Sequence, residues 1–417
     1  MITKILILGS APVHIKLIQA AKEMGLYTIV TDNIPYEKST GKQIADEAWN
    51  INIFDIEEIV KKSKESNVDA VISGWLDPCQ RPYQKICEGL GLPCYGTWEQ
   101  FYIMSNKRKF KSLCVQNNVS VLPDYSLNSP QQISYPVLVK PVDSRGSRGQ
   151  AICKSFEELT IAVDNARKES SNGDVLIEKY IERGNEFQVT YFVLNGQPYL
   201  IRTADSYCGS QENHMDKVVA CSVSPSRYTD LYIKTTHENV KKMIRSLGLQ
   251  NGPFFMQGFE DHGVFRFFDP GLRFPGVDFD LVYKHEFGFD AMKSLISIAL
   301  NQIEEADAIP EACVYLNNKK VAILFPTIKS GIIGRIVDAD VKNDSSVISY
   351  RPRWSVGSDI DWSYTVTQRS AEIVILSNSI SELKDKIENI QEKYKVYNTS
   401  LENMILEKFD TNRIPET

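Results

Sequence analysis

The first hundred residues alternate short apolar runs with amphipathic stretches. Residues 4–32 contain an apolar run that ends in glycine, a stretch with apolar side chains at helical spacing, and a second apolar run. A second cycle covers residues 54–91, and its last helical pattern begins at Pro82. Strand, helix and strand in succession imply a right-handed crossover and a parallel sheet. The pattern therefore predicts a Rossmann-like domain over residues 1–104.

The pattern of apolar and polar residues changes at residue 105, where Ser105 is the predicted N-cap of a basic helix. Strand and helix patterns then mix, with strands at 136–140, 174–179, 186–203 and 253–269, and helices at 155–170, 230–248 and 289–306. Further strands and a final helix near 379–396 follow. The expected fold class is a multidomain protein of α/β and α+β type, with a central domain at 105–310 and a β-rich C-terminal α/β module at 311–417.

Charge and composition exclude several classes of function. Lys and Arg number 47 against 53 Asp and Glu, a net charge of -6, which argues against a nucleic-acid or anionic-membrane surface. The N-terminus is apolar only over residues 5–8, so it predicts neither a signal peptide nor a membrane span, and we expect a cytoplasmic protein. The eight cysteines form no Cys-x-x-Cys pair and the five histidines are scattered, which argues against zinc and a histidine-centred triad.

The turn after the first strand bears on a dehydrogenase reading of the first domain. It carries one glycine, Gly9, where a dinucleotide fingerprint needs three. The sequence therefore gives no ground for nicotinamide binding.

The first candidate stretch is YPVLVKPVDSRGSRGQAI. An apolar strand delivers Lys140 and breaks at Pro141 into a loop in which Gly146 and Gly149 permit unusual backbone angles. Backbone N–H groups in such a loop, beside a lysine, suit phosphate oxygens. A surface hairpin with solvated charges is the alternative.

The second candidate stretch is DVLIEKYIERGNEFQVTYF. A strand ends at Glu178 and continues through Lys179, Tyr180 and Ile181, and Glu186 follows eight residues after Glu178. The first carboxylate suits an exocyclic amino group, the adjoining backbone suits the rest of an adenine edge, and the second carboxylate suits ribose hydroxyls. Two solvated acids are the alternative.

The third candidate stretch is GPFFMQGFEDHGVFRFFDPGLRFPGVDFD, which the polar EDHG turn predicts to be a hairpin. Gln257 lies on one strand, Asp269 ends the other, and Arg273 follows in a Pro/Gly turn. Oxygen ligands on neighbouring strands suit magnesium, and the arginine suits a planar anion. A structural ion pair is the alternative for the arginine.

These three stretches, in this order and with Lys107 ahead of them, closely resemble the ATP-grasp superfamily of carboxylate-amine ligases over essentially the whole chain. The resemblance implies ATP and Mg²⁺ as cofactors, with a lid subdomain at about 107–182 on the ATP-grasp core. The residues it assigns to nucleotide binding are Lys107, Lys140, Ser144, Gly146, Ser147, Glu178, Lys179, Tyr180, Ile181 and Glu186. It further assigns Gln257 and Asp269 to the metal, and Arg273 and Lys140 to catalysis.

The implied reaction activates a carboxylate as an acyl phosphate, which an amine attacks to give an amide, ADP and phosphate. Gln257 and Gly271 depart from the family, which commonly has an acid and an asparagine there. These departures favour an alternative, a catalytically weak regulatory or scaffold protein that binds nucleotide. Branches that make purine intermediates, carboxylate biotin or join amino acids share the layout, and the sequence does not choose among them.

The expected partners are a small carboxylate and a small amine, and a homodimer is the default assembly. Asp77 and Arg81, after a strand end, are candidates for holding the second substrate. Arg202 and Asp205 are candidates in a predicted loop over the substrate. Ordinary surface polarity is the alternative for all four.

Overall fold

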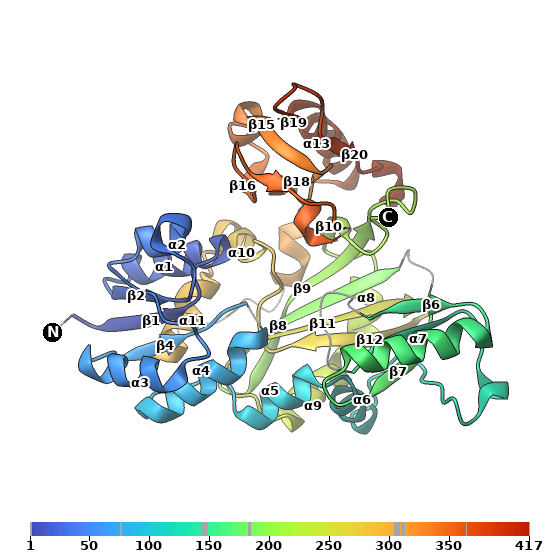
Figure 1. Ribbon diagram of the computed structural model, residues 1–417, viewed down its shortest axis with the longest axis horizontal. Coiled ribbons are helices and arrows are strands. Elements are labelled where there is room, and N and C mark those ends of the chain that lie inside the picture. The colour runs from blue at the N-terminus through green and yellow to red at the C-terminus, as the bar shows by residue number, and fades with distance from the viewer. Residues whose placement is uncertain are drawn as a thin grey trace.

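The computed structural model describes residues 2–75, 77–142, 149–181, 185–303, 309, 313–363 and 365–416. The N-terminal domain, the lid and the C-terminal module surround a central antiparallel sheet (Figure 1). The multidomain α/β and α+β class predicted from the sequence is confirmed.

The N-terminal domain has a four-stranded parallel sheet in the order β3-β2-β1-β4. Its elements are β1 (Lys4–Leu8), α1 (Ile15–Glu23), β2 (Tyr27–Thr31), α2 (Thr40–Ile44), β3 (Glu47–Trp49), α3 (Ile56–Glu65), β4 (Ala70–Ile72), α4 (Asp77–Leu90) and α5 (Trp98–Ser105). A helix of the central segment, α11 (Ala291–Ala299), packs against α1 and β4 (Figure 1). One apolar core therefore runs through both regions.

Three details of the first domain differ from the sequence prediction. The short β3 and α2 had no periodicity long enough to reveal them. Helix α4 begins at Asp77 rather than Pro82, because Asp77 and Pro78 suit a first turn and Pro82 lies inside the helix. The next helix, α6 (Lys107–Gln116), is capped by Asn106, whose side chain accepts from two backbone N–H groups, and the predicted cap Ser105 ends α5 instead.

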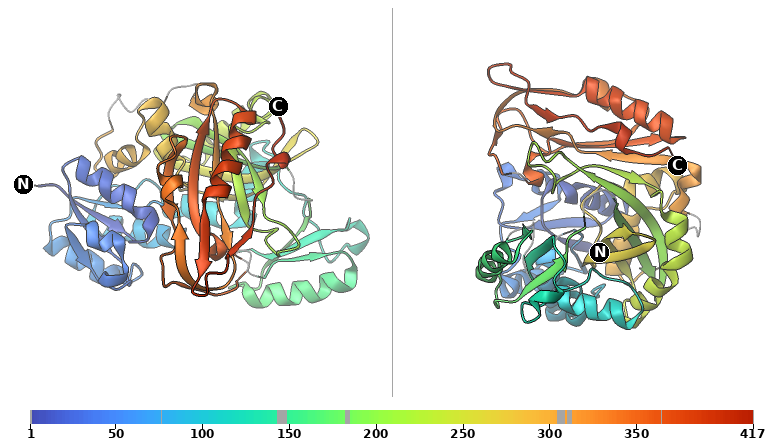
Figure 2. Two further views of the ribbon diagram at one scale, coloured as in Figure 1. Left: turned by 90° about the horizontal axis from the view of Figure 1, so that it is seen from above. Right: turned by 90° about the vertical axis from the view of Figure 1, so that its right-hand side faces the viewer.

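The lid is a three-stranded antiparallel sheet in the order β6-β5-β7, covered by one helix. Its elements are β5 (Val137–Pro141), β6 (Ala151–Cys153), α7 (Phe156–Glu169) and β7 (Val175–Lys179). Val137, Val139, Leu159 and Val163 form a core of its own. Figure 2 shows the lid projecting from the rest of the molecule.

The central sheet has eight antiparallel strands in the order β12-β11-β8-β9-β10-β13-β18-β16. Its first five strands are β8 (Glu186–Leu194), β9 (Gln197–Cys208), β10 (Val219–Ser224), β11 (Gly252–Asp261) and β12 (Val264–Gly271). The helices of this segment are α8 (Thr229–Thr235), α9 (His237–Ser246), α10 (Asp280–Phe287) and α11. The predicted helix 230–248 is thus two helices broken at Thr236, and the predicted helix 289–306 ends at Ala299, with residues 304–306 outside the described ranges.

The C-terminal module continues the central sheet through β13, β18 and β16, and it has a second core beneath α13. Its elements are β13 (Lys320–Leu324), β14 (Thr327–Ile328), β15 (Gly331–Val337), α12 (Ala339–Lys342), β16 (Val347–Pro352), β17 (Asp359–Ile360), β18 (Ala371–Ser377), α13 (Ile380–Lys393), β19 (Lys395–Asn398) and β20 (Ile405–Glu407). The module and the central domain therefore share backbone hydrogen bonds from β10 to β13. Within the described residues, no helix is long and apolar enough to cross a membrane.

Candidate active site

A cavity of about 480 Å³ lies where the lid, the central sheet and the C-terminal module meet, and Asp77 of the N-terminal domain reaches it. Nine of the residues that the resemblance assigns to nucleotide, metal or catalysis line it: Lys107, Lys140, Lys179, Tyr180, Ile181, Glu186, Gln257, Asp269 and Arg273. Ser144, Gly146 and Ser147 lie outside the described residues. The fold thus gathers into one cavity side chains that are spread over more than 160 positions of the chain.

Lys140 is held at the cavity by a buried carboxylate. The Glu178 carboxylate lies 2.5 Å from Lys140 Nζ and 2.5 Å from Lys111 Nζ. Burial raises the pKa of Glu178, but Lys140 and Lys111 outweigh it and the net pKa is below the ordinary value. Because Glu178 is fully buried and does not line the cavity, its placement differs from the predicted direct contact with adenine. Here it positions Lys140.

The backbone after β7 is only partly available to a ligand. Lys179 N–H donates to Pro123 O at 2.9 Å, and Tyr180 N–H donates to Pro136 O at 3.2 Å. Within the described residues, Ile181 N–H has no backbone acceptor. Among Lys179, Tyr180 and Ile181, whose backbone was predicted to meet the adenine ring, Ile181 therefore keeps an N–H that the ring could use.

Gln257 and Asp269 are direct cross-strand partners on β11 and β12, next to a bulge at Gly258. Paired positions share one face of a sheet, so both side-chain oxygens point to the cavity they line. Burial raises the pKa of Asp269, against the opposing pull of Lys107, Arg273 and Lys140. One carboxylate and one amide fit a single Mg²⁺, an ion that usually takes one or two carboxylates and completes its shell with water and phosphate.

Arg273 and Asp77 form an ion pair across two domains. Arg273 Nε donates to Asp77 Oδ1 at 2.7 Å and Arg273 Nη1 donates to Phe274 O at 3.1 Å, and both Arg273 and Asp77 line the cavity. A side chain at Gly271 would begin 3.2 Å from Arg273 Cγ and 3.6 Å from Asp77 Oδ1. The glycine thus makes room for this pair where the related family commonly has an asparagine.

Of the remaining candidates, only Arg202 reaches the cavity. Arg81 is exposed and lies over the Trp98 ring at 4.4 Å, outside the lining. Asp205 is buried and accepts from Ser226 Oγ and Arg227 N, so it braces the backbone after β10. The predicted substrate roles of Arg81 and Asp205 therefore find no support. Lining residues that sequence reasoning missed include Gln188, Ser222 and Arg369, which no local motif marks.

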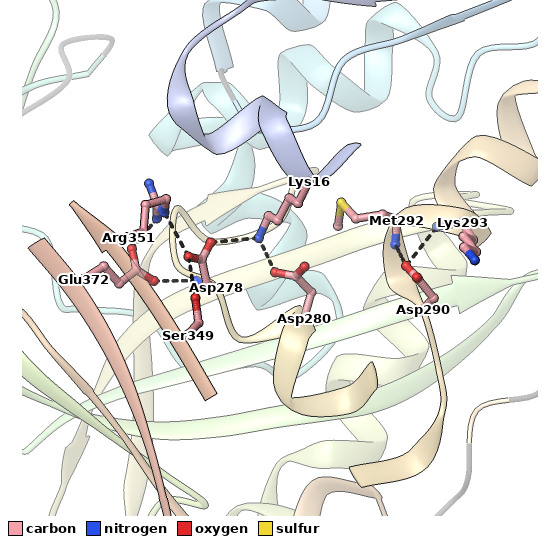
Figure 3. Close-up of polar contacts among 9 residues, drawn as sticks. All are labelled: Lys16, Asp278, Asp280, Asp290, Met292, Lys293, Ser349, Arg351 and Glu372. Atoms are coloured by element: carbon pink, nitrogen blue, oxygen red, sulfur yellow. Dashed lines mark hydrogen bonds and ion pairs between the residues drawn. The ribbon is translucent and has the colours of Figure 1, made fainter. Parts of the chain in front are cut away.

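An ionic network from three domains surrounds Asp278 and Asp280, which follow the turn of Arg273 in the chain (Figure 3). Lys16 of α1 pairs with Asp278 at 3.1 Å and with Asp280, and Arg351 of β16 pairs with Asp278 at 2.9 Å and with Glu372 of β18. Burial and the nearby Asp278 raise the pKa of Glu372 to about 7, against Arg351. The network therefore ties the segment from Asp278 to Asp280 to the N-terminal domain and to the C-terminal module.

The turn after β1 packs closely against a side chain. A Cβ at Gly9 would lie 2.7 Å from the His14 ring, which packs edge-on against Trp75.

Residues 108–261 match the model of the carbamoyl-phosphate synthase L chain, ATP binding domain. With that domain in the middle of the layout described above, the chain has the ATP-grasp fold, the fold of ATP-dependent ligases and carboxylases.

Three similar proteins illustrate the range of this fold. The chain is 28% identical over 212 residues to the 2-oxoglutarate carboxylase small subunit of Hydrogenobacter thermophilus, and the match covers 45% of each, so less than half of that relative is spanned. The dimeric biotin carboxylase domain of the same organism's enzyme, solved with MgADP and bicarbonate, superposes with a TM-score of 0.79 at 20% identity, covering 97% of this chain and 91% of that one. The L-amino acid ligase of Bacillus licheniformis superposes with a TM-score of 0.77 at 17% identity, covering 95% and 98%.

Proposed function

We propose that this protein is an ATP-dependent carbon-nitrogen ligase that activates a carboxylate as an acyl phosphate and passes the acyl group to an amine. The observation that carries the proposal is a single cavity lined by Lys107, Lys140, Asp269 and Arg273. Two phosphate-binding cations, a metal carboxylate and an anion-binding arginine are what phosphoryl transfer to a carboxylate requires.

ATP occupies the space between lid and central sheet. Ile181 N–H and Glu186 receive the adenosine, and Lys107 and Lys140 receive the phosphates. Lys107 Nζ donates to Val142 O at 3.3 Å, next to the end of β5, which carries Lys140, so the two lysines come from different elements. Mg²⁺ held by Asp269 and Gln257 neutralises phosphate charge when bound.

Arg273 orients the reacting carboxylate through the N–H groups that Asp77 and Phe274 leave open. A carboxylate oxygen attacks the γ-phosphorus, the bond to the β-phosphate oxygen breaks, and ADP leaves. The amine nitrogen then attacks the acyl carbon, the bond to the phosphate oxygen breaks, and the amine loses a proton as phosphate departs. Positioning and fixed charge supply the catalysis, and a closed lid keeps water from the acyl phosphate.

The L-amino acid ligase neighbour supports amide formation, while the carboxylase neighbours support a reaction on bicarbonate. The deciding measurement is release of ADP and phosphate from Mg-ATP across a panel of carboxylates, each with and without an amine, with bicarbonate and biotin as one pair. Release that needs one acid and one amine, with an amide mass in the product, supports the ligase. Release that needs only bicarbonate and biotin contradicts it.

The rival regulatory role predicts tight nucleotide binding with no turnover on any pair. Its support is the weakened metal set, in which Gln257 stands where the family has an acid. The dimeric carboxylase neighbour supports the expected homodimer, which light scattering on the purified chain tests.

A further inference from the structure

Two arginines at the cavity have no carboxylate partner among the described residues. Arg202, 1% exposed, donates only to neutral groups: Ser224 Oγ at 3.2 Å, Gln188 Oε1 at 3.2 Å and Ser222 Oγ at 2.8 Å. Arg369 donates from Nη2 to Val219 O at 2.8 Å.

The surroundings of both guanidinium groups are apolar on one side. Arg202 lies over the Phe279 ring at 4.7 Å, and Arg369 lies over the Phe325 ring at 4.0 Å. The Nε of Arg369 is buried without a hydrogen-bond partner in the part of the chain that the structure describes. Burial lowers the pKa of each arginine to about 10, although the charge of Glu372 raises both pKa values. Glu372 forms no ion pair with either arginine within the described residues, so both cations are only partly compensated by the protein itself.

The carboxylates of the cavity do not compensate them. Within the described lining these are Asp77, Glu186, Asp216 and Asp269, and none lies within 4.0 Å of either guanidinium. Asp77 already pairs with Arg273. A buried cation beside a cavity, left without a counter-ion, is stabilised when an anionic ligand brings one.

The sheet register places Arg202 relative to the proposed site of phosphoryl transfer. Asp269 pairs with Gln257, Gln257 pairs with Gln188, and Gln188 accepts from Arg202 Nη1. These side chains form a polar row on one face of the sheet, since cross-strand partners share a face. Strands lie about 5 Å apart, so Arg202 is roughly 10 to 15 Å from Asp269 along that row. This separation is on the scale of a small substrate molecule.

We propose that Arg202 and Arg369 bind a second anionic group of the substrates, a carboxylate or a phosphate monoester, in addition to the carboxylate that reacts. Ser222 and Gln188 hold the Arg202 guanidinium in place, and the free N–H of Arg369 Nε completes the site. The inference rests on the proposed ligase function. It narrows the substrate class of that ligase to pairs of substrates that together carry two anionic groups.

The test is calorimetric titration of the full chain, saturated with Mg-ADP, with three probes: glutarate, inorganic phosphate and acetate. Glutarate separates a carboxylate source from a phosphate source, and acetate reports a monoanion that occupies the Arg273 position alone. We expect the preferred probe of glutarate and phosphate to bind at least tenfold more tightly than acetate. Loss of charged hydrogen bonds in Arg369→Met should weaken it about tenfold.

Arg413→Met is the matched control. Arg413 also stacks on a ring, Phe409 at 5.6 Å, and donates to a main-chain carbonyl, Cys208 O at 2.6 Å, but lies outside the cavity lining. It should change probe binding less than twofold. Arg202→Lys retains the charge at the fully buried position and should lose only part of the affinity, whereas Arg202→Met should lose tenfold or more if it folds. Mg-ADP affinity should stay within twofold in each of these arginine variants.

Equal binding of all three probes, or probe binding that falls in Lys140→Met but not in Arg369→Met, overturns the proposal. The ligase function is judged separately by turnover. Anion binding that depends on Arg369, without turnover on any pair, supports this site and contradicts the ligase. Turnover with singly charged substrates that is unchanged in Arg369→Met supports the ligase and overturns this site.

Discussion

The two ends of the cavity treat buried charge in opposite ways. At the end proposed to bind the nucleotide, Lys140 and Lys111 share the buried carboxylate of Glu178. At the other end, Arg202 and Arg369 have neutral partners only, within the described residues. Lys140 is thus held in place by the protein itself, whereas the two arginines would gain a counter-ion from an anionic ligand. A side chain held in place in advance suits the binding of a nucleotide, which takes part in every turnover. A cation without a counter-ion suits substrate selection, because only an anionic substrate supplies the missing charge.

The largest expected effect comes from removing Lys140 at the proposed nucleotide end. Lys140→Met should lower the rate of ADP formation about 10²- to 10³-fold, because it removes a fixed charge from the transferring phosphate. Lys111→Met is the control, since it also breaks a pair with Glu178 but does not line the cavity. Both variants should lose stability on the order of 3 kcal/mol, as expected when one partner leaves a buried ion pair. Equal loss of ADP formation in the two would assign the effect to Glu178 and not to phosphate binding.

Arg273→Ala sharpens the comparison on the substrate side. The KM for the carboxylate should rise about 10- to 100-fold, the worth of one charge-assisted interaction, while the KM for ATP changes less than twofold. Steady-state kinetics with each substrate varied in turn measures both. Asp77→Asn, which weakens the same ion pair from the other side while keeping the arginine, is the control and should raise the carboxylate KM much less. A rise in both KM values would mean that Arg273 serves the nucleotide as well.

Gln257→Glu tests the metal position between the two ends. A second carboxylate opposite Asp269 should lower the Mg²⁺ concentration needed for half-maximal ADP formation several-fold, because Mg²⁺ prefers charged oxygen ligands. Gln188→Glu, the next residue in the same row, is the control and should leave the Mg²⁺ requirement unchanged. An unchanged Mg²⁺ requirement in Gln257→Glu would remove this position from the metal site.

The smallest effect concerns the ionic network around Asp278 and Asp280. The pKa of Glu372 is raised to about 7 from an ordinary 4.5, so the folded state favours its protonated form. Its contribution to stability is therefore full below about pH 4.5 and is lost as the pH rises to about 7, at on the order of 1 kcal/mol per pKa unit.

Glu372→Gln should flatten the pH dependence of the unfolding free energy between pH 4.5 and 7, as measured by urea denaturation. Glu382→Gln, on the exposed face of α13, is the control and should leave that slope in place. An unchanged slope in Glu372→Gln would show that another group titrates in this window.

The residues of the proposed nucleotide end could be singled out in the sequence because they lie in contiguous stretches. These stretches are the one around Lys140, the segment from Glu178 to Ile181 and the hairpin from Gln257 to Asp269, and their order carries the resemblance. The role of Glu178 was not readable, because the partner that buries it, Lys111, lies on a separate helix. The substrate end has no local signature, since Arg202 and Arg369 are far apart in the chain.

By itself the sequence predicted the parallel sheet of the first domain and the hairpin that carries Asp269, because local periodicity and turn chemistry encode them. The lid and the phosphate-binding roles proposed for the lysines were implied by the resemblance and not by periodicity. Only the tertiary structure decided that Asp77 pairs with Arg273 and that Glu178 pairs with Lys140. It also decided that the central sheet includes strands of the C-terminal module. Burial and charge pairing between distant segments arise when the sheets pack, and no stretch of the chain records them alone.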